Sequence, residues 1–458
     1  MKSLSTGLRA VGLCLVMGAA CLGGSLRPAA AEQLRLSPDQ AREAAAAALV
    51  AGQPRDALTF AKGVLLAQPD DTVALFIKAR ALRELGEADG ALEAAQAAWS
   101  RAVTPRERYF SAMMVAQMRS YAGHNGMAQL WLRRAAQIAP DDALKAVAVS
   151  DFRHVRRITP WRLAFDLFVT PSDNLNNATT EAQEVPGGLV ITTPPLKGVR
   201  SGAGVTFRYT KPLAQRSRLQ FAGFGQGSVV TLSEEAQAIP GADAADLSTR
   251  MLGGSLTWET ISQSRTRLGS AGLSFSRHWQ GGDPLADIAR LDLSVQQALS
   301  QDWIGRARLG LIDTARHDSS LGDSQRRELS LALVRRMEQG ALTLDVLAGE
   351  TLSAAYNVGR QDATVGLRYS LSKPVLGMMP TVSVAYGAYD YDAPWIALPN
   401  GPVREDRTRT VGVEVLLPEM GAYGFAPEIG LSFTDRSSNY NLYDSRTTDL
   451  RLGLKSVF

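Results

Sequence analysis

The residues whose side chains could carry covalent or metal chemistry are few in this chain. It has four histidines, and no two of them stand at a spacing that ligates one metal ion. The four are His124, His154, His278 and His317. Ser276 stands two residues before His278 on one expected strand, so the pair shares a face, but no nucleophile elbow or phosphate-binding loop accompanies it. We therefore expect a protein that is not an enzyme and uses no cofactor.

Charged residues, in contrast, are numerous and nearly balanced. The 458 residues include 49 Lys and Arg and 45 Asp and Glu, a net charge of +4, which does not indicate a nucleic-acid partner. In the second part of the chain charged residues alternate with apolar ones, which predicts that they share one face of successive strands. The residues expected to face a water-filled lumen are Arg162, Asp166, Arg306, Arg308, Arg368, Glu414 and Arg451.

The final strand shows this alternation clearly. Between Arg446 and Phe458, Leu450, Leu452 and Leu454 fall on one face, and polar or small residues fall on the other. Strands that are apolar outside and polar inside are typical of a barrel wall with lipid outside and water inside. An aromatic residue at the end of such a strand is the usual entry signal for outer-membrane barrels. We expect Phe458 to be the signal that the barrel-assembly machinery recognises.

The alternation predicts fourteen strands between residues 161 and 458. The links between them alternate in length: every second link is short, as in "SQD" and "EQG", and the others are mostly longer and rich in Asp, Asn, Gly and Pro. Outer-membrane barrels have short periplasmic turns and longer outer loops. The pattern predicts a 14-stranded antiparallel transmembrane β-barrel in outer-membrane lipid, with both of its ends in the periplasm.

Residues 32–150 have helical spacing instead. Three units of about 34 residues each place an alanine five residues after a glycine, and in two units a proline follows twelve residues later. This order is typical of tetratricopeptide repeats, in which glycine serves the turn, alanine lets paired helices approach, and proline closes the second helix. A plain helical bundle is the alternative. The repeat positions are Gly52, Ala57, Pro69, Gly86, Ala91, Gly123, Ala128 and Pro140.

Stacked helix pairs offer a concave surface that binds peptides or proteins, and the first helix of each pair lines it. We expect a client protein or a periplasmic chaperone to bind this groove. The candidate groove residues are Phe76, Arg80, Arg83, Tyr109, Met113 and Gln117.

The N-terminus has the features of a secretory signal peptide. Lys2 and Arg9 precede an apolar stretch, and three alanines before Glu32 fit a cleavage site. Lipidation at Cys21 is the competing interpretation, and both cysteines of the chain lie in this segment. The sequence thus predicts an α + β multidomain protein of the outer membrane with its N-terminal domain in the periplasm. Its expected parts are a signal peptide (1–31), tetratricopeptide-like repeats (32–150), a linker (151–160) and the barrel (161–458).

Three segments of the chain resemble the surface lipoprotein assembly modulators, which join a periplasmic tetratricopeptide domain to a fourteen-stranded barrel. They are "TPSDNLNNAT" (170–179), "GFAPEIGLSFTDRSSNYNLYDSR" (424–446) and the closing "LRLGLKSVF". The loop residues that carry the likeness are Ser172, Asp173, Asn174, Asn176, Asn177, Asn439, Asn441, Tyr443 and Asp444.

The resemblance implies a function in transport across the outer membrane. Members of that family move lipoproteins from the periplasm to the cell surface, so the expected function is an outer-membrane translocator for proteins of the surface-lipoprotein class. Two other functions fit the same architecture. One is a porin-like or receptor channel with an accessory periplasmic domain, and the other is an exopolysaccharide export barrel.

Overall fold

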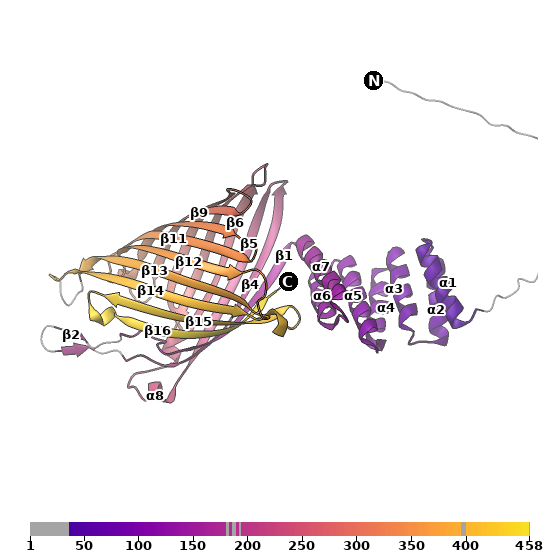
Figure 1. Cartoon of the computed structure of the whole chain (residues 1–458), viewed down its shortest axis with the longest axis horizontal. Helices are drawn as coiled ribbons and strands as arrows, with labels where there is room; N and C mark the ends of the chain where they lie inside the picture. Colours follow the sequence, from indigo (N-terminus) through magenta and orange to yellow (C-terminus); the bar gives the residue numbers. More distant parts are fainter. Residues whose placement is uncertain (1–35, 180–182, 186–188, 192–193, 395–399, 458) are drawn as a thin grey trace, which may run out of the picture.

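The computed structural model describes residues 36–458 except 180–182, 186–188, 192–193, 395–399 and 458. The expected signal peptide, Cys21 and Phe458 therefore lie outside the described residues. A helical domain is followed along the chain by a β-barrel, and the two lie end to end, with the helices extending away from one mouth of the barrel (Figure 1). We call that mouth the near end and the opposite mouth the far end.

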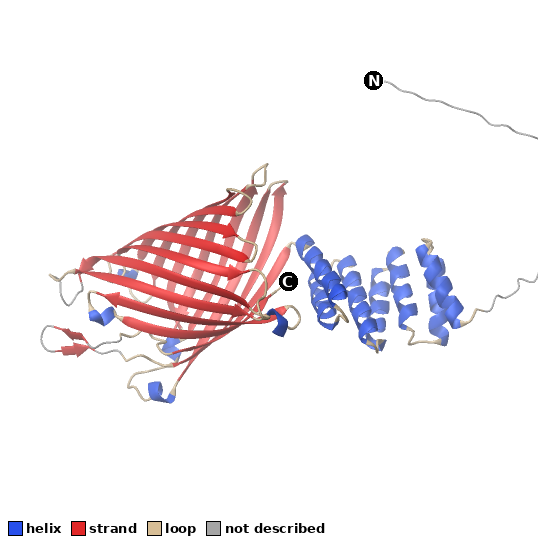
Figure 2. Cartoon of the chain, viewed as in Figure 1, coloured by secondary structure: helices blue, strands red, loops and turns tan. Residues whose placement is uncertain are grey.

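Seven helices form the described part of the N-terminal domain, each packed against the next (Figure 2). Along the described residues, no helix is both long and apolar enough to cross a membrane. Residues 151–158, expected in a linker, are instead the second half of the last helix, where Phe152 and Val155 are buried. The helices are α1 (Pro38–Val50), α2 (Pro54–Ala67), α3 (Thr72–Glu84), α4 (Ala88–Arg101), α5 (Pro105–Tyr121), α6 (Asn125–Ile138) and α7 (Asp142–Ile158).

Local sequence explains where these helices begin. The Thr104 hydroxyl accepts a hydrogen bond from the Glu107 amide, and the Glu107 carboxylate accepts one from the Thr104 amide, which forms a capping box at α5. Ser37 and Gln40 do the same at α1. The Asp71 carboxylate caps α3 by accepting from the Ala74 amide.

The repeat positions lie where tetratricopeptide geometry needs them. Gly52, Gly86 and Gly123 follow α1, α3 and α5 with φ of +71°, +85° and +80°, a conformation that favours glycine. The three alanines of the repeat have no exposed surface and lie where paired helices touch. They are Ala57, Ala91 and Ala128, and the two repeat prolines, Pro69 and Pro140, follow the ends of α2 and α6. The helical domain thus has the predicted repeat order.

Fourteen antiparallel strands close into a barrel, which confirms the predicted fold class. Each strand pairs with its neighbour along the chain, and the first strand, β1, closes the barrel against the last, β16. A separate hairpin of β2 (Gln183–Val185) and β3 (Leu189–Ile191) lies in the loop after β1. The barrel strands are β1 (Trp161–Ser172), β4 (Gly198–Ala214), β5 (Ser217–Leu232), β6 (Thr249–Ile261), β7 (Arg267–Gln280), β8 (Asp283–Ala298), β9 (Trp303–Arg316), β10 (Ser324–Arg336), β11 (Gly340–Ser353), β12 (Arg360–Leu371), β13 (Met379–Pro394), β14 (Val403–Leu416), β15 (Phe425–Ser438) and β16 (Ser445–Ser456).

Each of these strands turns exposed apolar side chains to one face. On β14, for example, Val411 and Val413 are exposed and lie opposite Val384 and Val382 of β13, which are exposed as well. Aromatic side chains of the same face gather toward the near end, as in the girdles of outer-membrane barrels. They include Trp161, Tyr209, Trp258, Trp303 and Phe425. A closed ring of strands with apolar side chains on its outer face is the architecture of an outer-membrane barrel.

Links between strands are mostly shorter at the near end and mostly longer at the far end, as predicted, although the near-end links after β12 and β14 have seven and eight residues. One far-end link differs: β7 and β8 are joined by only Gly281 and Gly282, with φ of +62° and +100°. Both strands continue past the region of regular apolar alternation. The alternation reports where the wall meets lipid, whereas the hydrogen-bonded ladder extends beyond it, so the sequence pattern underestimates strand length here.

Candidate functional site

A concave groove on the helical domain is the first candidate site. The first helices of the three pairs, α1, α3 and α5, line it side by side, and it encloses about 690 Å³. Its floor is apolar, and arginines and a glutamate stand at its rim. The lining residues are Ala46, Leu49, Val50, Thr72, Val73, Phe76, Ile77, Arg80, Thr104, Arg106, Glu107, Phe110, Met113, Met114 and Gln117.

The structure brings four of the six predicted groove residues together: Phe76, Arg80, Met113 and Gln117. Tyr109 instead lies in the domain core, 1% exposed, and its hydroxyl donates to the Leu144 carbonyl oxygen at 2.8 Å. Burial raises the pKa of Tyr109. Arg83, one turn beyond Arg80 on α3, is not among the lining residues. Helical spacing alone did not separate the groove face from the core face of α5.

Phe110, the residue after Tyr109, is the groove aromatic that the sequence analysis missed. Its ring is 38% exposed at the groove, and the Arg106 guanidinium lies 5.8 Å from the ring centroid. Val50 and Val73 are exposed there too, at 89% and 48%. Large apolar side chains that are exposed together mark an interaction surface.

The charge of the groove is basic. Arg106 stands on α5, and Arg80 on α3 lies 4.0 Å from Glu84, a long and exposed ion pair. The Glu107 carboxylate is already engaged, because it accepts the backbone amides of Thr104 and Val103 at 3.0 and 2.9 Å. These hydrogen bonds lower the pKa of Glu107. These bonds come from neutral amides and leave the carboxylate charged, so the lining, with Arg80 and Arg106 against Glu107, carries one net positive charge.

Helix α6 fixes the helical domain to the near end of the barrel. The Arg133 guanidinium donates to the Tyr423 carbonyl oxygen and to the Ser456 hydroxyl, both at 2.9 Å. It lies 4.6 Å and 4.5 Å from the ring centroids of Phe152 on α7 and Phe425 on β15. The Gln137 side chain also accepts from the Tyr423 amide. Burial lowers the pKa of Arg133 to about 10, so the side chain stays charged at neutral pH.

Replacing Arg133 by alanine is expected to loosen this junction. The variant loses two charge-assisted hydrogen bonds and two aromatic contacts, together about 2–3 kcal/mol of local coupling. Hydrogen exchange of the turn that holds Tyr423 should then accelerate by about tenfold or more. Arg134→Ala is the matched control, because Arg134 packs on Trp99 and Trp131 inside the helical domain. Equal exchange of that turn in both variants would contradict the junction.

The seven predicted lumen residues all lie on the inward side of their strands, opposite the exposed apolar side chains. The Asp166 carboxylate of β1 and the Arg451 guanidinium of β16 approach to 3.1 Å, and Arg308 reaches Asp292 at 2.8 Å. The Arg306 guanidinium donates to the Gln296 side chain. The other three predicted lumen residues are placed by their register partners: Arg162 lies opposite Arg208, Arg368 opposite Ser383, and Glu414 opposite Thr381.

A chain of ion pairs crosses the inner wall from β8 to β12. Arg290 joins Asp292 and Glu328, and Arg326 joins Glu328 and Asp362 at 3.1 and 2.6 Å. The Asp362 carboxylate is 3% exposed and its two oxygens accept both terminal nitrogens of Arg326. Alternating charges of this kind stabilise the wall and keep the lumen polar.

Ser276 and His278 also lie on the inner wall. The Ser276 hydroxyl and the His278 Nε2 are 3.1 Å apart. Their register neighbours on β6 and β8 are Gly253, Met251, Ile288 and Ala286, so no acidic side chain stands beside the pair on either strand. Over the residues that the structure describes, no three His, Cys, Asp or Glu side chains gather as a metal site.

The motif residues around 172–177 organise the far end. The buried Asn174 side chain accepts the Ala178 amide at 2.7 Å and donates to the Arg446 carbonyl oxygen at 3.0 Å. The Asn176 side chain accepts the Leu196 amide and donates to the Pro194 carbonyl oxygen of the same loop. Three neighbouring motif residues also shape the loop through backbone hydrogen bonds or a turn. The Ser172 hydroxyl accepts the Asn174 amide, the Asp173 carboxylate accepts the Thr448 amide, and Asn177 turns with φ of +50°.

The second motif lies beside the first. The Asn439 side chain bridges Glu405 and Val403, the Asp444 carboxylate accepts the Ser438 amide, and the Arg404 guanidinium lies 3.3 Å from the Tyr443 ring centroid. Burial raises the pKa of Tyr443 to about 12. The Asn441 carbonyl oxygen accepts the Thr179 hydroxyl, so the two motifs touch although 262 residues separate these partners. The motifs therefore join the loops on the two sides of the barrel closure.

Solved structures resemble each part of the chain separately. The first tetratricopeptide domain of Spaghetti (RPAP3), solved with an HSP90 peptide, has 15% identity and a TM-score of 0.24, over 26% of this chain and 93% of that one. A loop-deletion mutant of the Vibrio cholerae outer-membrane protein OmpT has 9% identity and a TM-score of 0.35, over 65% of this chain and 99% of that one. No curated protein matches the sequence.

Fold and site together define an outer-membrane β-barrel that carries a tetratricopeptide-like domain. Residues 273–458, from within β7 to the end of the chain, match the family model described as surface lipoprotein assembly modifier. This match confirms the family that the sequence motifs indicated, over this part of the barrel. It supports a role in surface lipoprotein assembly or as an outer-membrane channel.

Proposed function

We propose that this protein is an outer-membrane translocator that delivers proteins, of the surface-lipoprotein class, from the periplasm to the cell surface. The groove of α1, α3 and α5 captures a segment of the client or of its chaperone, and the barrel passes the client outward. The observation that carries the proposal is the exposed apolar groove on a helical domain that Arg133 fixes to the barrel mouth. A passive channel has no need of such a groove.

The proposed orientation places the near end in the periplasm. An even number of strands brings both chain ends to the same mouth of the barrel, where the helices lie. The short turns lie at this mouth, and short turns are periplasmic in outer-membrane barrels. The groove would then meet its client before the barrel does.

The client segment that fits the groove combines apolar side chains with acidic groups. Phe76, Phe110 and Val73 offer apolar contacts, and Arg80 and Arg106 offer positive charge beside them. Arginine binds carboxylates with paired hydrogen bonds, which favours acidic partners over basic ones. We propose that an amphipathic, net-acidic segment of the client occupies the groove.

Delivery in this proposal uses no catalytic residue. The periplasm lacks ATP, so client folding or release outside the cell supplies the direction of transport. The inner-wall charges guide the client without reacting with it. Ion pairs such as Arg308 with Asp292 are compatible with a porin-like channel as well, which is the second candidate function.

The test is a surface-display assay in the native host. Cellular lipoproteins are labelled with an alkyne fatty acid, and those reached by a membrane-impermeant biotin reagent on intact cells are quantified against the total. Arg80→Glu combined with Phe76→Ala should weaken capture by about tenfold and lower display accordingly, because central apolar and arginine contacts dominate such interfaces.

Lys62→Glu is the charge-matched control, because Lys62 is exposed on α2, outside the groove. Both variants should show the same amount of folded, heat-modifiable barrel. Unchanged display with the groove variant would leave the channel as the better account.

A further inference from the structure

The junction between β1 and β16 is the least paired in the barrel. Across the described residues, β1 has twelve residue partners on β4 but only three on β16. They are Phe168 with Gly453, Val169 with Leu452, and Ser172 with Asp449. Every other pair of neighbouring barrel strands shares at least eleven. Unpaired backbone groups are costly in lipid, and fewer ladder pairs would have to be broken to part these two strands than any other neighbouring pair.

Both ends of the seam are held by other contacts. At the far end, the Asp173 carboxylate accepts the Thr448 amide and the Asn174 side chain donates to Arg446. At the near end, α6 touches both strands. Gly126 packs so closely on the Trp161 ring of β1 that an added Cβ would lie 2.3 Å from it, and Arg133 binds Ser456 of β16. The sparse ladder therefore lies between two fixed points, and one of them belongs to the helical domain.

The register shows where the ladder is missing. Phe168 opposite Gly453 would place Leu167 opposite Leu454 and Phe165 opposite Ser456, but neither pair forms. On the lumen side of this stretch a single ion pair, Asp166 with Arg451, joins the two strands. The near half of the seam is thus held by side chains on its lumen side, and not by the backbone ladder.

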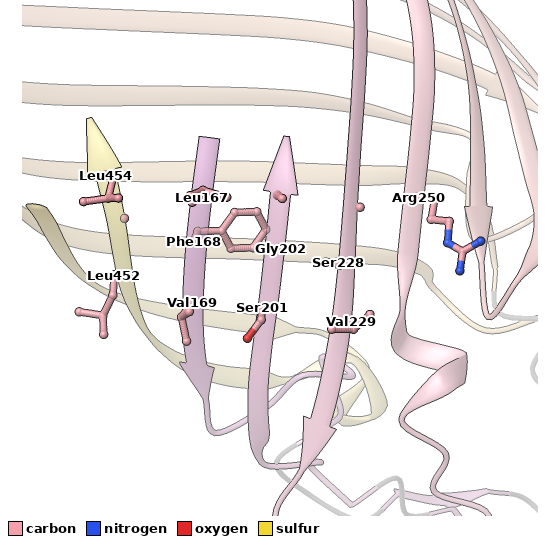
Figure 3. Close-up of a pocket in the computed structure, with 13 residues that line it drawn as sticks. Leu167, Phe168, Val169, Ser201, Gly202, Ser228, Val229, Arg250, Leu452 and Leu454 are labelled. Carbon is pink, nitrogen blue, oxygen red and sulfur yellow. The ribbon is translucent and has the colours of Figure 1, made fainter. Parts of the chain in front are cut away.

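A groove on the outer wall lies against this seam. It encloses about 650 Å³ and is lined by side chains from β16, β1, β4, β5 and β6 (Figure 3). Small residues of β4 and β5, such as Ala203 and Gly227, form its floor. Leu167 and Val169 of β1 and Leu452 and Leu454 of β16 stand at the seam side. The groove faces the same way as the exposed apolar wall, so membrane lipid surrounds it.

We infer that the β1–β16 seam is a lateral exit for the acyl chains of a lipid-anchored client, and that the adjoining groove receives these chains. The inference rests on the proposed function. A lipid-anchored protein has to keep its acyl chains out of water, and the inner wall is lined with charges such as Arg451. A seam that opens sideways lets the polypeptide stay in the polar lumen while the chains enter the membrane. The exposed cation of Arg250 at the groove suits the polar head of a lipid.

A disulfide lock across the seam tests this exit. Val169 and Leu452 are register partners, and the described residues contain no cysteine, so Val169→Cys with Leu452→Cys places one pair across the seam. The control is Val384→Cys with Val411→Cys, which joins β13 to β14 away from the groove, where the ladder is continuous. The readout is the surface-display assay, on cells with equal amounts of folded barrel.

Oxidation of the seam pair should lower display by about fivefold or more, and reductant should restore it, while the control pair shows neither change. Full display with a formed seam disulfide would overturn the lateral exit. The proposed function would still stand if the groove variant of α3 lowered display in the same cells. An equal fall for surface proteins without the fatty-acid label would assign the seam to polypeptide and overturn the acyl-chain assignment.

Discussion

A chain that lacks residues 37–158 is expected to fold into a normal barrel that no longer displays its client. The helical domain has its own hydrophobic clusters, and the barrel closes through its own strands. The deletion has to extend to Ile158 because α7 packs on α6 through Phe152 and Val155, which a shorter deletion would expose. The deletion variant keeps a passage but loses the capture groove.

We expect the surface-display signal of this variant to fall by about tenfold or more, since capture raises the local concentration of client at the mouth. Heat-modifiable migration in outer-membrane fractions verifies that the barrel is folded. The whole chain at the same membrane level is the control. Undiminished display by the barrel alone would remove the capture groove from the account and favour the channel.

Asp362→Ala is expected to destabilise the barrel more than other single changes in the inner wall. The carboxylate is 3% exposed and accepts Arg326 at 2.6 and 2.9 Å, while Arg360 lies 3.5 Å away. Its removal leaves two guanidinium groups beside one another without their shared acid. Removing one partner of a buried ion pair costs about 3–5 kcal/mol.

Urea unfolding of the barrel in lipid vesicles measures this loss. The double variant Arg326→Ala with Asp362→Ala should recover part of it, because only one of the two guanidinium groups, that of Arg360, is then left without the shared acid. Asp302→Ala, in an exposed near-end turn, is the surface control. A midpoint for Asp362→Ala equal to that of the control would show that the ion-pair chain contributes little to stability.

The barrel wall could be predicted from sequence because its cause is local. Each strand that meets lipid has to alternate, so residues such as Val411 and Val413 reveal the face of β14 without knowledge of its neighbours. The same holds for Gly52 and Gly86, whose turns need a positive φ wherever the helices go. Patterns of this kind also placed the seven lumen charges on the inward side.

Contacts between distant segments could not be predicted in this way. Arg133 meets Tyr423 and Ser456 across 290 and 323 residues, and nothing near Arg133 in the sequence indicates a barrel rim. Tyr109 and Phe110 are neighbours on α5, yet Tyr109 packs in the core against α6 and α7 while Phe110 lines the groove. The motif residues lie in loops as expected, except Ser172, which is the last residue of β1, but their contact across the barrel closure depends on the closed ring.

The most direct test of the central claim compares cells that make the whole chain with otherwise identical cells that do not. The measurement is the fraction of fatty-acid-labelled protein that the membrane-impermeant reagent reaches on intact cells. Capture in the groove and passage through the barrel predict at least one labelled protein whose surface fraction falls when the chain is absent, while its total amount is unchanged. Identical surface fractions for every labelled protein in the two strains would contradict the account.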